Sequence, residues 1–123
     1  MVYERTVVVD LEALRASADH SPRIERQMVL LFMGTAERCL GLIQGLVVRG
    51  DSRDWQAVVH KLRMASTHIH AQELSALCKH IEDIKEDDAI SRLSAFLEIK
   101  KAYEGLVMCL RNADLLTHQA HGG

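Results

Sequence analysis

The stretch SPRIERQMVLLFMGTAERCLGLIQGLVVRGDS, residues 21–52, decides the fold of this chain of 123 residues. It opens with Ser21-Pro22, an N-cap followed by proline at the first helical position, where a missing N–H costs nothing. Apolar or small side chains then recur at spacings of three and four, and the set that we assign to the core is Ile24, Met28, Leu31, Thr35, Cys39, Leu42 and Leu46. Gly50 ends this predicted helix, and Asp51 or Ser52 caps the next one. A turn this short makes the two helices antiparallel neighbours.

Helix signals continue on both sides of this hairpin. Upstream, Asp10 is placed as the N-cap of a short helix that ends near Asp19. Downstream, a third helix is expected from about Arg53 to Ile69, and a fourth carries the stripe Leu74, Leu77, Cys78 and Ile81. Asp87 or Asp88 caps a last helix, whose predicted core residues are Ile90, Leu93, Phe96, Tyr103, Val107 and Leu110. The pattern predicts an all-α protein, an antiparallel up-down-up-down four-helix bundle with an extra short N-terminal helix at one end.

Length and composition place the whole of this pattern in one domain. A chain of 123 residues leaves no room for separate catalytic and regulatory domains, and 48% hydrophobic with 26% charged residues is an ordinary globular balance that excludes disorder. We therefore expect residues 1–123 to form a single domain, with the bundle at about 10–112. The tail 117–123 lacks periodicity, and we expect it to be frayed.

The charge, hydropathy and cysteine pattern indicate which classes of partner and which cellular compartment to expect. Lys and Arg total 15 against 17 for Asp and Glu, so a net charge of -2 offers no basic footprint for nucleic acid. We find no apolar stretch that approaches the roughly 18 residues of a membrane span and no signal-peptide pattern, so we expect no membrane association and a cytoplasmic protein. Cys39, Cys78 and Cys109 form no Cys-x-x-Cys pair and are interpreted as buried, reduced thiols.

Short catalytic signatures are absent from the sequence. It contains no phosphate-binding Gly-x-x-x-x-Gly-Lys-Ser/Thr loop, no Gly-x-Gly-x-x-Gly, no His-Glu-x-x-His and no Gly-x-Ser-x-Gly. A self-contained enzyme is therefore not expected, and the chemistry must come from the seven histidines. His68 and His70 stand two apart and so point to different sides of a helix, which makes a poor chelate, and the remaining histidines lack partners at useful spacing: His20, His80, His118 and His121. We expect no metal site.

His60 stands out by its place on the third helix. At about 100° per residue it points away from the apolar stripe formed by Trp55, Val58, Leu62, Ala65 and Ile69. We predict that its side chain is more than half exposed near the middle of a long helix. On geometry alone an ordinary solvated histidine is the simplest interpretation.

The residues around His60 resemble a known family. The stretch 55–66 reads WQAVVHKLRMAS, and it is followed by Leu74, Leu77, Cys78 and Ile81-Glu82. This is similar to the histidine-containing phosphotransfer (Hpt) domain of bacterial phosphorelays, whose motif is His-x-Leu-Lys-Gly-small-small, with a Gly-Ala pair ten residues on and a Leu-x-x-x-Cys-x-x-Leu-Glu helix next. Residues 10–14 and Leu31-Phe32 also stand where such domains have them, so the resemblance covers most of the chain.

Two positions depart from the family pattern. Met64 replaces the glycine four residues after the histidine, and it projects about 40° from His60, one turn along the helix. Its side chain is therefore expected to crowd the approach of a phosphorylated partner. His70 replaces the second glycine, which ends the third helix in a left-handed conformation that histidine tolerates better than most residues.

The resemblance implies a role for each of three residues. His60 is the phosphoacceptor, taking a phosphoryl group from a receiver domain or a histidine kinase and passing it to a receiver, through a neutral imidazole that is available because histidine titrates near pH 7. Arg63 stands where the family has the lysine that neutralises the phosphoryl oxygens. Glu82 matches a family glutamate that orients the imidazole, although from the sequence it is equally well a solvated helix residue. No cofactor is expected on this chain, and Mg²⁺ is expected to come with the receiver.

The face around His60 is expected to dock the partner, which is a response-regulator receiver or a hybrid histidine kinase. The docking set is Arg53, Gln56, Ala57, Lys61, Met64 and Thr67. A different class of function fits the same bundle: an interaction module that docks and regulates a signalling partner without carrying phosphate, which Met64 favours because methionine adds adaptable apolar contact area. The presence of His60 and of a cation at Arg63 favours phosphotransfer. A plain helical dimerisation bundle ranks below both, because it leaves His60 without a role.

Overall fold

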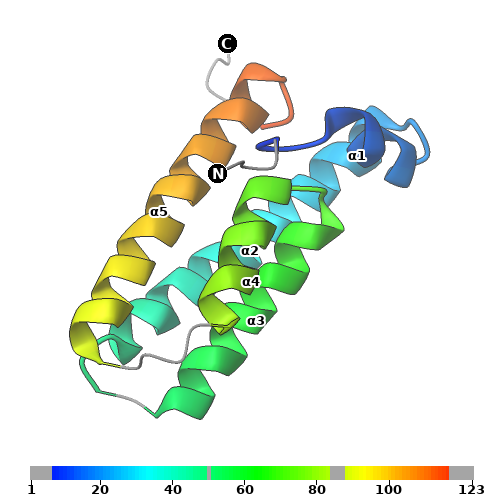
Figure 1. The fold of residues 1–123 in the computed structure, drawn as a ribbon. Coiled ribbons are helices and arrows are strands. Elements are labelled where there is room, and N and C mark those ends of the chain that lie inside the picture. Colours follow the sequence, from blue (N-terminus) through cyan, green and yellow to red (C-terminus); the bar gives the residue numbers. More distant parts are fainter. Residues whose placement is uncertain (1–6, 50, 84–87, 117–123) are drawn as a thin grey trace.

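The computed structural model describes residues 7–49, 51–83 and 88–116, and in these ranges it is helical without a strand. Its helices are α1 (Leu11–Ser17), α2 (Pro22–Leu46), α3 (Ser52–His68), α4 (Gln72–Asp83) and α5 (Ala89–Asn112). Helices α2 to α5 run alternately up and down along one bundle, and α1 lies across one end of it (Figure 1). The predicted all-α antiparallel four-helix bundle with a short extra N-terminal helix is confirmed.

The predicted helix starts are confirmed by side-chain caps. Asp10 accepts a hydrogen bond from the N–H of Ala13, and Ser21 accepts one from Ile24 in front of Pro22. Asp51 accepts from two amides of the first turn of α3, and Asp88, rather than Asp87, caps α5. Each cap satisfies amides that have no partner inside the helix, so each helix begins where a short polar side chain stands.

Helix α2 differs from the prediction at its end and in its buried face. Its α-helical bonding ends at Leu46, where the Val47 N–H bonds back to Gln44 in a tighter turn, and Gly50 lies outside the described residues. The buried face is rotated by about one residue from the predicted one and consists of Glu25, Val29, Phe32, Ala36, Cys39 and Ile43. Most residues of this helix are apolar or small, so two neighbouring stripes satisfied the same spacing rule. Leu31 and Leu42, both predicted in the core, are exposed by 73% and 56%.

The composition of α2 also corrects the expectation about apolar stretches. Between Arg26 and Arg49 the only charged residues are Glu37 and Arg38, and α2 is long and apolar enough to cross a membrane by length and composition alone. In the structure its buried face packs into the bundle core instead, as the core helix of a globular domain does.

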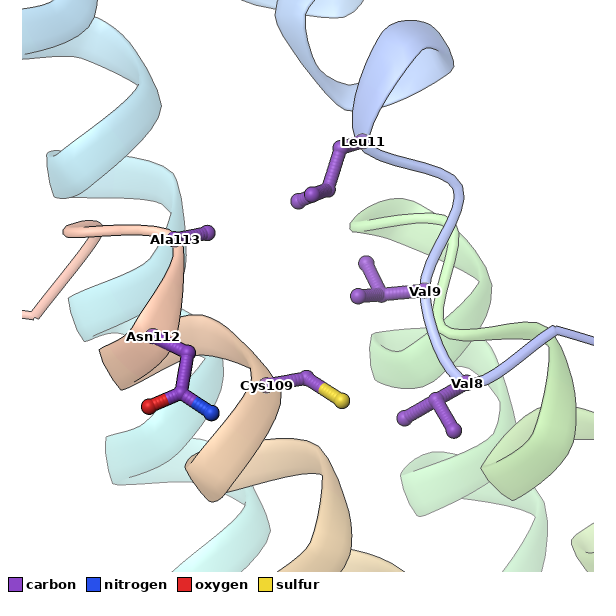
Figure 2. A pocket seen from close by; sticks show the side chains of 6 residues that line it. All are labelled: Val8, Val9, Leu11, Cys109, Asn112 and Ala113. Carbon is purple, nitrogen blue, oxygen red and sulfur yellow. The ribbon is translucent and has the colours of Figure 1, made fainter.

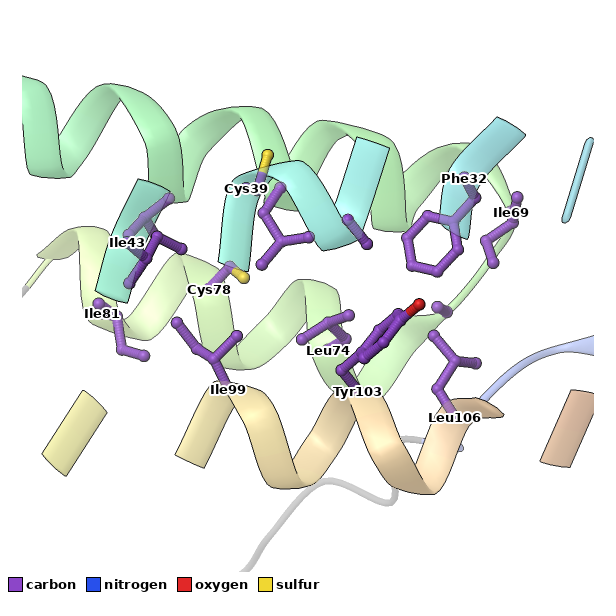
Figure 3. Close-up of a cluster of buried hydrophobic side chains, with 14 of the residues drawn as sticks. Phe32, Cys39, Ile43, Ile69, Leu74, Cys78, Ile81, Ile99, Tyr103 and Leu106 are labelled. Carbon is purple, nitrogen blue, oxygen red and sulfur yellow. The ribbon is translucent and has the colours of Figure 1, made fainter. Parts of the chain in front are cut away.

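The core runs the length of the bundle between α2, α3, α4 and α5 (Figure 3). Every helix contributes large side chains that are almost fully buried, among them Leu62, Ile69, Leu74, Ile99 and Leu106. On α3 the buried face is Trp55, Val59, Leu62 and Ser66, so Val58 and Ala65 of the predicted stripe lie at its edge, half-buried. The same is true of Leu77 on α4.

Helix α5 buries a charged residue that periodicity could not anticipate. Arg92 is 6% exposed, while the predicted core residues Ile90 and Leu93 are 82% and 47% exposed. Its guanidinium Nη1 donates to the Leu46 carbonyl at 2.7 Å and lies 5.4 Å from the centre of the Trp55 ring. A cation at the carboxyl end of α2 that also stacks on an aromatic ring is stabilised by both contacts, so Arg92 takes an inward position.

The chain before α1 is tied to the turn between α3 and α4. The Asp10 N–H donates to the His70 carbonyl at 2.9 Å, and the Glu73 N–H donates to the Val7 carbonyl at 3.0 Å. On its other side this segment forms a shallow groove with the end of α5, lined by Val8, Val9, Leu11, Cys109, Asn112 and Ala113 (Figure 2). Cys109 is therefore only half-buried, whereas Cys39 and Cys78 are buried as expected, and all three thiols are free. The tail 117–123 lies outside the described residues.

Candidate functional site

His60 lies in the middle of α3, on the side away from the core. Its side chain is 51% exposed, which confirms the prediction that it is more than half exposed. The residues on the opposite side of the helix explain this placement, because Leu62 and Val59 fill the core and leave no buried position for the imidazole. The ring is held at one edge and open at the other.

Glu82 of α4 reaches the imidazole from the neighbouring helix. Its Oε1 lies 3.1 Å from His60 Nδ1, and its side chain is only 17% exposed. Burial opposes the charged carboxylate, but the hydrogen bonds from Arg63 and His60 outweigh it, so the pKa of Glu82 is held below its usual value. Of the two interpretations open from the sequence, the structure shows a carboxylate bound to the imidazole and not a freely solvated one.

Arg63, one turn after His60 on α3, completes the cluster. Its Nε donates to Glu82 Oε2, and its Nη2 lies 3.1 Å from His60 Nδ1 and 3.5 Å from Glu82 Oε1. The hydrogen bond to Glu82 raises the pKa of Arg63 above its already high value, so the guanidinium is always charged. Arg63 therefore faces the Nδ1 edge of the ring. No described residue forms a hydrogen bond with Nε2.

The local sequence explains why these three side chains meet. His60 and Arg63 are three residues apart, which places them on neighbouring ridges of one helix, and Glu82 is set one turn after Cys78 on α4. The Cys78 side chain is buried, and its burial raises the thiol pKa to about 12, with Glu82 adding to the rise. The thiol therefore stays protonated and inert behind the cluster.

All six residues predicted to dock a partner lie exposed on α3: Arg53, Gln56, Ala57, Lys61, Met64 and Thr67. Met64 is 51% exposed, one turn from His60 on the same side. Thr67 differs from the rest, because its hydroxyl is already engaged with the Arg63 carbonyl at 2.9 Å and with the Ser75 hydroxyl at 2.8 Å. It is therefore a link between α3 and α4 as well as a surface residue.

The exposed leucines of α2 are the residues that the sequence reasoning missed. Glu37, which accepts a hydrogen bond from Tyr103 of α5, lies at one edge of the buried face of α2, and Leu31 and Leu42 lie at the opposite edge. Because α2 packs against both α5 and α3, the edge that carries Leu31 and Leu42 is the one on the side of the His60 helix. Nothing in a one-dimensional apolar pattern separates an exposed leucine from a buried one when both stripes are apolar.

The second departure from the family pattern, His70, has a clear structural basis. It has a φ of 61°, the left-handed conformation expected after the end of α3. Its Nε2 lies 2.8 Å from the Ser17 hydroxyl, so its side chain binds α1 to the end of the bundle. Among residues 7–49, 51–83 and 88–116, no group of three or more His, Cys, Asp or Glu is placed so that it could hold a metal ion.

The comparison with protein families agrees with this geometry. The family model for the Hpt domain matches residues 27–112, which include all of α3, α4 and α5 and all but the first five residues of α2. The chain belongs to the Hpt domain family. Hpt domains are phosphocarrier modules that work in phosphotransfer relays of two-component signalling and interact with receiver domains and histidine kinases. No curated protein and no solved structure matches the chain significantly.

Proposed function

We propose that this Hpt domain carries a phosphoryl group on His60, accepted from a receiver domain or a histidine kinase and passed to a response-regulator receiver. The observation that carries the proposal is the orientation of the ring. Glu82 contacts Nδ1, while Nε2 has no hydrogen-bond partner among the described residues, and the side chain as a whole is 51% exposed. Nε2 is thus the nitrogen that a partner can reach.

The transfer step follows from this geometry. With a proton on Nδ1 donated to Glu82, the Nε2 lone pair attacks the phosphorus of an aspartyl phosphate, and the bond from phosphorus to the aspartyl oxygen breaks. The aspartate leaves as a carboxylate, and the positive charge that develops on the ring lies beside the Glu82 carboxylate, which stabilises it. Arg63 supplies a positive charge at the site for the phosphoryl oxygens. Mg²⁺ is proposed to arrive with the receiver, since Glu82 is the only carboxylate that contacts His60 or Arg63 among the described residues.

The docking face is proposed to combine α3 and α2. Around His60 it presents the cations Arg53 and Lys61 and the half-exposed Met64, and α2 adds the exposed Leu31 and Leu42 from its edge on the α3 side. Exposed apolar side chains next to a polar reactive centre are typical of a protein-binding surface. We place the protein in the cytoplasm, where buried unpaired thiols such as Cys39 and Cys78 stay reduced.

The test is phosphoryl transfer from the cognate phosphorylated receiver. We expect an acid-labile, base-stable label on the wild-type chain and none on His60→Gln. His68→Gln is the matched control, because His68 is exposed on the same helix without belonging to the cluster. Label that persists in His60→Gln would assign the acceptor to another residue.

A second function is favoured by the exposure of Met64. An Hpt-like module that docks a receiver and carries no phosphate would use that methionine as contact area next to an idle histidine. Tight receiver binding with no label on the wild-type chain would select this function and exclude phosphotransfer.

A further inference from the structure

Arg63 and Glu82 both contact the same nitrogen of His60. A hydrogen bond to Arg63 requires a lone pair on that nitrogen, whereas a hydrogen bond to Glu82 requires a proton on it. Arg63 Nη2 and Glu82 Oε1 each lie 3.1 Å from Nδ1. A guanidinium can only donate a hydrogen bond, and an ionised carboxylate can only accept one. A neutral imidazole nitrogen either carries a proton or offers a lone pair, so only one of the two contacts is a hydrogen bond at any moment.

The choice between the two contacts sets the tautomer of the ring. When Nδ1 carries the proton it donates to Glu82, and the Nε2 lone pair is free to attack phosphorus. When Nδ1 accepts from Arg63, the proton sits on Nε2, and the nitrogen that a partner can reach is no longer a nucleophile. One contact therefore corresponds to a reactive histidine and the other to an unreactive one.

We propose that Arg63 is a positioning residue that controls the tautomer of His60, holding the ring in its unreactive form until an incoming phosphoryl group draws the guanidinium away from Nδ1. This inference rests on the proposed role of His60 as phosphoacceptor and adds a regulating step to it. The arrival of the phosphoryl group then does two things through one side chain. The phosphoryl oxygens gain the positive charge of Arg63, and Nδ1 becomes free to donate a hydrogen bond to Glu82.

The proton balance of the step closes through exchange with water. When Arg63 leaves Nδ1, the ring changes tautomer: exposed Nε2 releases its proton to water and Nδ1 takes one up from water, with no net change in charge. Nε2 then forms its bond to phosphorus as the bond from phosphorus to the aspartyl oxygen breaks, and the proton stays on Nδ1, hydrogen-bonded to Glu82. Return of the phosphoryl group to a receiver reverses these changes.

The geometry makes an arginine suited to this role. Its Nε is bound to Glu82 Oε2 while its Nη2 reaches both Nδ1 and, at 3.5 Å, the second carboxylate oxygen. A lysine presents a single nitrogen as a point charge and cannot bind Glu82 through one atom and Nδ1 through another. The side chain of Arg63 is 25% exposed, so the guanidinium borders solvent and can turn toward an arriving anion.

The experiment measures the tautomer directly, by ¹⁵N NMR of the His60 ring in the full chain at about pH 8.5, where histidine side chains are neutral. Arg63→Met removes the donor and keeps an unbranched apolar stem, so we expect the ratio of the Nδ1–H to the Nε2–H form to rise about tenfold, the size expected for loss of one charge-assisted hydrogen bond. Arg63→Lys gives an intermediate ratio. Lys61→Met is the matched control, because it removes a neighbouring positive charge that does not contact Nδ1, and it leaves the ratio unchanged.

The partner variant tests the other contact. Glu82→Leu removes the acceptor, and we expect the ratio to move in the opposite direction, toward Nε2–H. An unchanged ratio in Arg63→Met, or an equal shift in Lys61→Met, overturns the inference. The tautomer ratios are measured without any phosphotransfer. If the ratio does not change in the variants while the wild-type chain still takes up label, tautomer control alone is refuted. A ratio that responds as expected in a chain that takes up no label refutes the phosphoacceptor role and leaves the competition for Nδ1 established.

Discussion

Removal of the Met64 side chain tests how a partner approaches His60. Met64 is 51% exposed, so the substitution gives up little buried apolar area, and its effect on stability comes from the backbone. Glycine inside a helix costs about 1 kcal/mol relative to good helix formers, and in a domain of this size Met64→Gly should lower the melting temperature by about 4 °C. If the methionine displaces the reacting atoms by about 1 Å, removing it should raise the single-turnover transfer rate on the order of a hundredfold.

Met64→Ala separates the two effects of that change. Alanine removes the side chain beyond the Cβ and keeps full helix propensity, so it should raise the rate like glycine with no loss of stability. The assay is single-turnover transfer from the phosphorylated receiver, with thermal unfolding followed by circular dichroism. A rate that is unchanged or lower in both variants, with both folded, would show that Met64 does not obstruct transfer and is a contact that the partner uses.

Three further outcomes follow from the contacts of the site and of the bundle end. Arg63→Ala should slow single-turnover transfer more than it weakens receiver binding measured by titration calorimetry, because a charge-assisted contact to the moving phosphoryl group strengthens in the transition state; an effect on affinity alone contradicts this. Unfolded glutamate takes up a proton near about pH 4.3 while folded Glu82 stays charged to lower pH, so its contribution to stability is present above that value and is lost as the pH falls through the depressed folded pKa. Urea unfolding should therefore show a shallower loss of stability in acid for Glu82→Gln than for the wild type, and parallel curves refute the ion pair. Ser17→Ala should cost about 1 kcal/mol through the lost bond to His70, and in that background His70→Gly should regain about 1 kcal/mol by relieving the left-handed backbone, whereas a further loss would refute the strain.

The parts of the fold that the sequence predicted correctly depend on local rules. The caps at Asp10, Ser21, Asp51 and Asp88 each need only a short polar side chain and the amides of the next turn, so they can be read without tertiary information. The exposure of His60 followed from the strong apolar stripe opposite it on α3.

The parts that were missed depend on contacts between helices. The inward position of Arg92 requires the Leu46 carbonyl of α2 and the ring of Trp55 on α3. The phase of α2 is set by which of two apolar stripes meets α3 and α5, and spacing along α2 alone does not contain that choice. The contact of Glu82 with His60 likewise depends on how α4 lies against α3, which is why the sequence left two interpretations of the glutamate open.

The two departures from the Hpt glycines differ in how the structure accommodates them. His70 adopts the left-handed backbone conformation that its position after α3 requires, and its ring lies 2.8 Å from the Ser17 hydroxyl. At Met64 the bundle supplies no comparable site, because half of the side chain remains in solvent beside His60. A partner that delivers a phosphoryl group to Nε2 must therefore accommodate this methionine on its own surface. Because a flexible, unbranched side chain fits a recess and clashes with a flat face, Met64 favours receivers with a recess at that point and acts against the others. If Met64→Gly and Met64→Ala raise the transfer rate as predicted, the same residue would also restrict which receivers this Hpt domain serves.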